Sequence, residues 1–307
     1  MRRPGRLRLP SVLLVVAAMT AWVVPGSAAV TTRAYLFPPA VARSTPPCDR
    51  THSSLRPAGP PRVTPGSFMA KIRAHHRLIA GVSEYTYPFG FFNPLDGRVE
   101  GFEIDIVHAI AKAIFGNPNK VEFKAISDAQ RIPEVQSGAV DIVAHTMTIL
   151  CDRLKSVDFS TVYFHAGAQV LVLKNSPVKS LADLRGKKVC ATTLSDSLGY
   201  IKTAHAIPVP VTNFTDCLML LQQDDVAAIS TDDNILAGLQ AQDPWTKIVG
   251  KVFSSEPYGL AISKMHPDFV RFVNAVLQQM RTDGQWAASY ARWIGGPVPA
   301  PPPAHYK

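Results

Sequence analysis

The middle of the chain alternates between short apolar runs and stretches with helical periodicity. The run 140–144 has the Val and Ile content of a buried strand, whereas apolar residues in 103–115 recur at i, i+3, i+4 and i+7. The pattern predicts strands at 77–82, 120–125, 140–144, 168–173, 188–191 and 227–230, and helices at 103–115, 133–138, 216–223, 232–241 and 267–282. This alternation is typical of an α/β fold with mostly parallel sheets flanked by helices, where ligands bind beyond the carboxyl ends of the strands.

An aromatic stripe follows the longest predicted helix. Trp286, Tyr290 and Trp293 recur with helical spacing just after Gly284. We expect a final helix docked on the core, because three large aromatic side chains are rarely left in water.

Prolines mark both ends of the folded unit. Eleven of the 26 prolines lie in residues 1–67 and five more in 297–303. We therefore expect a Pro-rich linker at 30–67 and a Pro-rich tail at 297–307, neither packed against a core.

The charge of the chain is concentrated near its N-terminus. The formal net charge is +9, of which residues 1–29 carry +4, residues 30–67 carry +4 and residues 68–307 carry +1. The nearly neutral remainder argues against a nucleic-acid partner. A hydrophobic content of 47% with only 18% charged residues also excludes a disordered chain.

The first 29 residues have the pattern of a signal peptide. Four arginines precede an apolar stretch at 12–24, and small residues follow it at 25–29. The stretch is shorter than the roughly 20 residues that span a bilayer. We expect export to the periplasm, cell envelope or exterior, with cleavage before Val30; an uncleaved anchor is the alternative.

The four cysteines are expected to form disulfides. Their spacing does not match that of metal ligands, and an even number in an exported chain favours disulfide bonds. Cys190 and Cys217 fall in one strand–helix unit and form the expected pair, which leaves Cys48 to pair with Cys151. Buried free thiols are the alternative. No cofactor-binding motif is present, so we expect neither a metal nor a cofactor.

Polar residues follow two of the predicted buried strands. Thr146, Thr148 and Arg153 come after the strand at 140–144, and hydroxyls beside an arginine fork suit the capture of a carboxylate. Asp232 follows the strand at 227–230 and could hold an ammonium group. For both residues a purely structural role stays open. Arg153 could form a surface ion pair with Asp152 or Asp158, and Asp232 could cap a helix.

Several ordered segments between residues 75 and 296 resemble one protein family. They are Arg77–Val82 with Pro88 and Phe89, Val99–Val107, Gly138–Val143, Thr146–Thr148 before Asp152 and Arg153, Val157–Ser160, Ser180–Val189, Glu256–Gly259 and Asp283–Trp286. In order and content they resemble the family 3 extracellular solute-binding proteins, the polar-amino-acid receptors of ABC importers. The Pro-rich lead, the tail and the four cysteines look most similar to the actinobacterial glutamine/glutamate-binding branch of that family.

The resemblance implies a type II periplasmic-binding-protein clam-shell of two α/β lobes. Lobe one would comprise 68–167 and 259–296, and lobe two would comprise 168–258, with hinge strands at Gly167–Leu173 and Tyr258–Ile262. It also implies a monomeric receptor, not an enzyme, that binds an amino acid and serves an ABC permease or a membrane sensor.

The resemblance also implies roles for individual residues. Arg153, assisted by Thr148, would grip the ligand α-carboxylate. The Thr146 carbonyl and Asp232 would hold the α-ammonium, and Phe89 would line the pocket.

Several positions depart from the family pattern. Ser83 and Glu84 occupy the first loop, where an aspartate is frequent, and Asp128 replaces a common aromatic residue. Where the family usually has a glycine-rich loop, this chain has Thr193–Ser197, so Ser195, Asp196 and Ser197 would face the ligand.

Three hypotheses follow for function. His145 and Arg131, as the basic groups nearest the cleft loops, favour a receptor for an acidic or amide amino acid. A cyclohexadienyl dehydratase-like enzyme would use Glu84 or Asp196 as general acid or base. The lost glycine loop instead favours a ligand-free sensory or interaction module.

Overall fold

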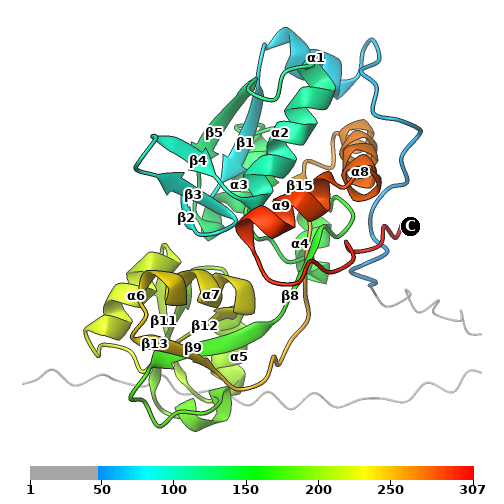
Figure 1. Ribbon diagram of the computed structural model, residues 1–307. Coiled ribbons are helices and arrows are strands. Elements are labelled where there is room, and N and C mark those ends of the chain that lie inside the picture. The colour runs from blue at the N-terminus through cyan, green and yellow to red at the C-terminus, as the bar shows by residue number, and fades with distance from the viewer. Residues whose placement is uncertain (1–47) are drawn as a thin grey trace, which may run out of the picture. The chain divides into compact units, whose positions relative to one another are not determined.

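Two five-stranded sheets organise residues 48–307, the part of the chain that the computed structural model describes (Figure 1). The first sheet has the order β5 (Val121–Ala125), β1 (Leu78–Val82), β6 (Ile142–Ala144), β15 (Ala261–Ile262) and β7 (Asp158–Phe159). The second has the order β11 (Ile207–Val211), β10 (Lys188–Thr192), β12 (Ala228–Asp232), β9 (Ala168–Leu173) and β13 (Thr246–Val249). The predicted signal peptide at 1–29 and the expected cleavage before Val30 lie outside the described residues.

The predicted mostly parallel sheets are confirmed. In the first sheet β1 runs parallel to β5 and β6, and only β15 is reversed relative to its neighbours. In the second sheet β10 runs parallel to β11 and β12, and only β9 is reversed. Each sheet, with the helices packed on it, forms one lobe of a two-lobed α/β fold.

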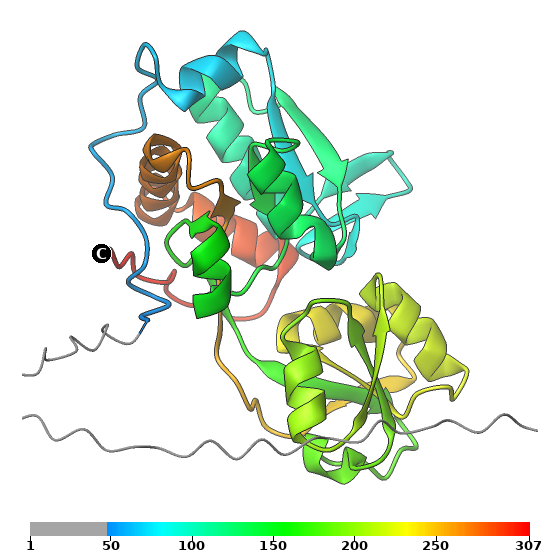
Figure 2. The same ribbon diagram turned by 180° about the vertical axis from the view of Figure 1, so that it is seen from behind.

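Two short strands connect the lobes. β8 (Phe164–Ala166) and β14 (Glu256–Tyr258) pair antiparallel, and Figure 2 shows both connections between the sheets. The hinge strands expected at Gly167–Leu173 and Tyr258–Ile262 are therefore displaced. Residues 168–173 are β9, a largely buried strand inside the second sheet, because their apolar side chains need cover on both faces.

Helices cover both sheets. Lobe one carries α1 (Phe68–Ala74), α2 (Phe102–Phe115), α3 (Arg131–Ser137), α4 (Cys151–Ser156), α8 (Pro267–Thr282) and α9 (Gln285–Trp293); lobe two carries α5 (Ser197–Thr203), α6 (Phe214–Gln222) and α7 (Asp233–Gln242). The expected aromatic helix is α9, and Trp286 is buried. The sequence did not predict the ribbon of β2 (Tyr85–Thr86), β3 (Gly90–Asn93) and β4 (Arg98–Glu100).

Two helices begin two or more residues before the predicted starts at Pro133 and Asp216. α3 starts at Arg131 rather than Pro133, because a one-turn helix at Asp128–Gln130 leads directly into it. α6 starts at Phe214 rather than Asp216. Asp216 sits in its first turn and accepts a hydrogen bond from the Asn213 N–H (3.0 Å), as in a capping box.

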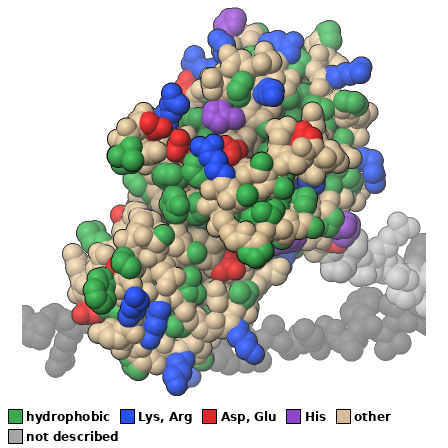
Figure 3. Space-filling model, viewed as in Figure 1, with side chains coloured by type: hydrophobic (Ala, Val, Ile, Leu, Met, Phe, Trp, Pro, Cys, Tyr) green, Lys and Arg blue, Asp and Glu red, His purple; other side chains and the backbone are tan. Residues whose placement is uncertain are grey.

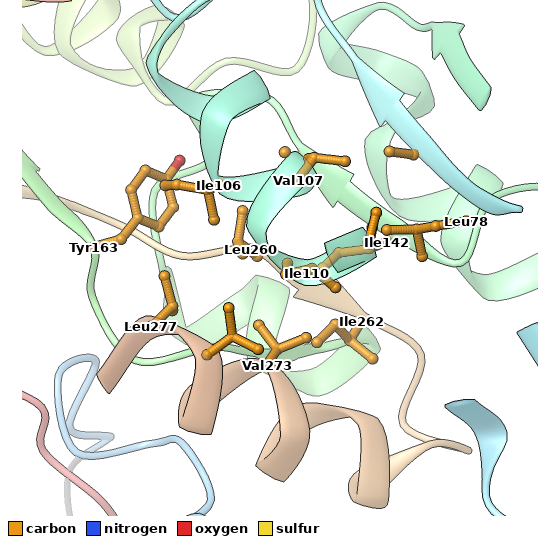
Figure 4. Close-up of a cluster of buried hydrophobic side chains, with 14 of the residues drawn as sticks. Leu78, Ile106, Val107, Ile110, Ile142, Tyr163, Leu260, Ile262, Val273 and Leu277 are labelled. Atoms are coloured by element: carbon orange, nitrogen blue, oxygen red, sulfur yellow. The ribbon is translucent and has the colours of Figure 1, made fainter. Parts of the chain in front are cut away.

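The core of lobe one lies between its sheet and two helices. Ile106 and Ile110 of α2 and Val273 and Leu277 of α8 converge on Leu260 and neighbouring strand residues (Figure 4). Each of these side chains has almost no exposed area. This packing fixes the loops that leave the sheet at its carboxyl end.

The Pro-rich segments at 48–67 and 297–307 pack on lobe one, so the expectation of a loose linker and tail is wrong for these residues. Asn274 of α8 donates a hydrogen bond to the Leu55 carbonyl (2.7 Å), and Arg281 donates to the Pro302 carbonyl (2.8 Å). The Lys307 N–H donates to the Ser54 carbonyl (2.9 Å). Proline removes an N–H donor but keeps its carbonyl, so side-chain donors can still fix such segments.

Two disulfides are present, and they are the expected pairs. Cys48 joins Cys151 at the start of α4, and Cys190 of β10 joins Cys217 of α6. No helix within 48–307 combines the length and apolar character needed to cross a membrane.

Removal of the Cys190–Cys217 disulfide should destabilise lobe two. The bond closes a loop of 27 residues, for which the chain-entropy model gives about 3 kcal/mol. We expect the Cys190→Ala/Cys217→Ala variant to unfold at lower denaturant concentration than the wild type. The control compares two proteins that both lack Cys48 and Cys151, one with and one without the Cys190–Cys217 bond. Dithiothreitol should lower the unfolding midpoint only of the protein that keeps this bond. An unchanged unfolding midpoint would show that the crosslink contributes little.

Candidate functional site

Arg153 is held inside the protein by the first turn of α4. The residue is only 8% exposed, and Nη1 donates a hydrogen bond to the Thr148 carbonyl (2.8 Å). Nη2 lies 3.5 Å from the Leu194 carbonyl and 4.0 Å from Asp196 Oδ1, both in lobe two. The guanidinium therefore reaches across from lobe one to lobe two.

The alternative of a surface ion pair for Arg153 is wrong. Asp152 pairs with Lys155 at 2.6 Å, and Asp158 lies 3.9 Å from Lys307. Within residues 48–307, the only carboxylate within 4.0 Å of the Arg153 guanidinium is Asp196. A buried arginine without a close, two-point counter-ion can accept a further anion.

Asp232 ends β12 at the N-cap position of α7, yet its side chain does not cap the helix. The carboxylate instead accepts a hydrogen bond from the Tyr258 hydroxyl of β14. Burial, followed by the negative charge of Asp196, raises the pKa of Asp232 well above its ordinary value. A buried carboxyl in this setting would be stabilised in its charged form by a cation.

Glu256 adds a third carboxyl beside Asp196 and Asp232. It is fully buried on β14 and accepts a hydrogen bond from the Tyr200 hydroxyl (2.8 Å). Burial, together with a hydrogen bond and a like charge from Asp196, raises the pKa of Glu256 to about 7. Glu256 lies in one of the segments that resemble the family, but no site role was predicted for it.

Two buried polar atoms around these residues lack a partner within the described part of the chain. They are Ser195 Oγ and Asn234 Nδ2, whereas the buried Asp196 Oδ2 and Glu256 Oε2 belong to neighbouring carboxyl groups that can share a proton. Buried polar groups in native proteins are nearly always hydrogen-bonded, so these two atoms need an explanation. A polar ligand between Arg153 and Asp232 would supply partners.

A second polar network joins the lobes nearby. Asp128 forms a 2.9 Å ion pair with Arg131 and accepts a hydrogen bond from the Thr192 hydroxyl of lobe two. Arg131 also donates to the His145 carbonyl (3.0 Å). Burial lowers the pKa of His145 to about 4, although Asp128 opposes the shift. Arg131 is thus already paired and His145 is neutral near pH 7, which removes the reason for expecting an acidic ligand side chain.

The Thr146–Thr148 loop is shaped by a buried acid that the sequence analysis missed. Thr146 has φ +38°, and its N–H donates to Glu103 Oε1 (2.7 Å), which also accepts from the Tyr163 hydroxyl. Burial raises the pKa of Glu103 to about 7. The sequence signal that could have indicated this buried acid is the position of Glu103 among the apolar residues at the start of α2. Thr148 is buried, and its backbone forms an isolated antiparallel β-bridge with Tyr258 of β14.

The first loop has a local structural role in this arrangement. Ser83 Oγ lies 2.8 Å from the Thr86 hydroxyl and accepts from the Tyr85 N–H, and the Glu84 carbonyl accepts from Phe92. Phe89 has no exposed area and packs edge-on against the rings of Phe102, Phe164 and Tyr258. Phe89 therefore supports the Tyr258 ring, and no open surface of Phe89 faces a pocket.

The loop at 193–197 keeps a tight turn without the glycine of the family pattern. Leu194 adopts φ +62°, in the left-handed region that favours glycine, and its side chain is exposed. The Ser195 N–H donates to the Thr192 carbonyl (3.1 Å), and Ser197 is the buried first residue of α5. The turn delivers Ser195 and Asp196 to the Arg153 side of the site.

Charged side chains are dispersed over the face of the molecule shown in Figure 3. Lys and Arg side chains are scattered over both lobes among polar and hydrophobic ones. This distribution agrees with the +1 net charge of residues 68–307.

Comparison with known proteins identifies the family. The family model described as "Bacterial extracellular solute-binding proteins, family 3" matches residues 78–296. The ABC transporter glutamine-binding protein GlnH of Bacillus subtilis is 38% identical over 229 residues, covering 74% of this chain and 84% of that protein. The glutamine-binding protein of Geobacillus stearothermophilus is 39% identical over 199 residues, covering 64% and 76%.

A solved structure agrees with the sequence relatives. An ancestral arginine-binding protein bound to glutamine is 38% identical and superposes with a TM-score of 0.68, covering 72% of this chain and 99% of that one. The family match spans more than two thirds of the chain and includes both sheets. The chain therefore belongs to the bacterial extracellular solute-binding proteins, family 3.

Proposed function

We propose that this chain is an exported receptor that encloses one free amino acid between its two lobes and presents it to an ABC permease or a membrane sensor. The observation that carries the proposal is the placement of Arg153 and Asp232. Both are buried, they come from different lobes, and each has capacity for an opposite charge. A free amino acid carries one carboxylate and one ammonium, which matches this pair.

The lobe boundaries form part of the proposal. Lobe one would comprise 68–167 and 259–296, lobe two would comprise 168–258, and residues 48–67 and 297–307 would move with lobe one. A ligand that touches both lobes binds the closed arrangement more tightly than the open one. It thereby shifts the equilibrium toward closure, which the transporter or sensor would recognise.

The preferred ligand is an amide amino acid, with glutamine first. Arg131 is already paired with Asp128 and His145 is neutral, so neither offers a free positive charge to an acidic side chain. The carboxylate of Asp196 would also repel one. Two relatives 38–39% identical to this chain are named as glutamine-binding proteins, which supports the same choice.

Calorimetric titration with the twenty amino acids tests the proposal. We expect glutamine to bind tightest and to be recovered unchanged. Turnover of the ligand would instead support the dehydratase-like enzyme, with Glu84 or Asp196 as candidate acid or base. Absence of binding to all twenty would support the ligand-free module.

Asp232→Asn should weaken glutamine binding at least tenfold. The substitution keeps an oxygen that can accept from the Tyr258 hydroxyl but removes the charge that would face the ligand ammonium. Asp225→Asn provides the matched control, since Asp225 is an exposed acid of the same lobe. Equal affinities for the two variants would remove Asp232 from the proposed site.

A further inference from the structure

Asp196 is the one carboxylate within 4.0 Å of the Arg153 guanidinium in the described residues, and it belongs to the protein itself. Its Oδ1 lies 4.0 Å from Arg153 Nη2, and the side chain is 18% exposed. Its Oδ2 is buried beside the carboxyl group of Glu256, with which it can share a proton. The contact depends on a departure from the family pattern, because Asp196 lies in the loop where small, uncharged residues are usual.

We propose that Asp196 competes with the ligand α-carboxylate for Arg153 and thereby sets a lower affinity and a stronger discrimination against anionic groups than the rest of the site would give. This inference rests on the proposed function. The function requires only that an amino acid binds, whereas the inference states what Asp196 does to that binding.

Three observations argue that Asp196 faces the carboxylate end of the ligand. Its own partner is the guanidinium, and the preceding residue, Ser195, has an unpartnered buried hydroxyl. The ammonium end already has Asp232, whose hydrogen bond from Tyr258 orients it. A ligand carboxylate that reaches Arg153 must therefore approach a second negative charge within a few ångströms.

The surroundings of Asp196 keep it in place. Glu256 of β14 lies beside it, and Tyr200 of α5 donates a hydrogen bond to Glu256. Within residues 48–307, Arg153 is the only cationic side chain within 4.0 Å of Asp196. The attraction to Arg153 therefore keeps the Asp196 carboxylate near the guanidinium when no ligand carboxylate is bound. Displacing Asp196 costs free energy, which reduces the net free energy of ligand binding.

Asp196→Asn is the direct test, because asparagine keeps the shape and removes the charge. We expect L-glutamine to bind this variant at least tenfold more tightly than the wild type. L-glutamine α-amide, which has no carboxylate, should show no gain. Asp196→Ser should change glutamine binding in the same direction, which guards against an effect specific to asparagine.

The outcomes separate the inference from the function. If the wild type binds glutamine and neither variant binds it more tightly, Asp196 is not a competitor. Equal tightening for glutamine and its α-amide also overturns the inference, because the gain would not depend on the carboxylate. If neither the wild type nor the variants bind any of the twenty amino acids, the proposed function itself fails. Melting curves confirm that each variant is folded.

Discussion

Replacing Arg153 by alanine should reduce amino-acid affinity by about 2–5 kcal/mol, which is the range for removing one partner of a buried, hydrogen-bonded charge pair. Arg153 is 8% exposed and its guanidinium is fixed by the Thr148 carbonyl, so little reorganisation is needed when a carboxylate arrives. In the alanine variant the ligand carboxylate would be buried without its counter-ion. Asp196 would then face that carboxylate with no cation between them.

Arg153→Lys should recover little of the loss. An ammonium cannot form the planar two-point contact with a carboxylate while also donating to the Thr148 carbonyl. Lys155→Ala is the matched control, because Lys155 lies on the same helix but is exposed and paired with Asp152. Titration calorimetry beside melting curves measures both effects. Wild-type affinity in a folded Arg153→Ala variant would mean that the guanidinium only joins the lobes.

The regular elements were predictable because each depends on a local pattern. The helix expected at 103–115 is α2, which begins one residue earlier and ends at Phe115, followed by Gly116 in the left-handed conformation. The buried strands were identified because both of their faces need apolar side chains. The β2–β4 ribbon was missed because strands of two to four residues are too short to show an alternation.

The charged pairs of the site were not predictable in the same way. Arg153 and Asp232 could be singled out because each follows a buried strand, but their surroundings come from distant segments. The pairing of Arg131 with Asp128 cancels a charge that the sequence analysis treated as free. Glu103 and Glu256 depend on burial, which pattern alone does not reveal for an acid. Long-range partners, more than local propensity, decide the chemistry here.

Gly238 of α7 marks a second place where the lobes meet. A Cβ atom built on Gly238 would lie 1.8 Å from the Tyr87 carbonyl oxygen and 2.9 Å from its carbon. Tyr87 belongs to the loop between β2 and β3 of lobe one, whereas α7 packs on the sheet of lobe two (Figure 1). The backbone of one lobe therefore approaches a helix of the other more closely than any side chain allows.

Gly238→Ala should weaken glutamine binding at least tenfold without destabilising the unliganded protein. The clash is with a backbone carbonyl of the other lobe, so the lobes cannot reach this arrangement unless one of them shifts. Within α7 itself, alanine favours the helix by about 1 kcal/mol over glycine. The melting temperature without ligand should accordingly stay the same or rise, while ligand-induced stabilisation falls.

Gly199→Ala separates closure from helix propensity. Gly199 also lies in a helix of lobe two, α5, but a Cβ there would meet nothing within 4 Å. This variant should gain the same helical preference and keep wild-type affinity, so the difference between the two variants isolates the contact with Tyr87. If Gly238→Ala binds glutamine as tightly as Gly199→Ala, the ligand-bound lobes do not meet at Tyr87, and closure must proceed through the Asp128–Thr192 and Arg153–Asp196 contacts without it.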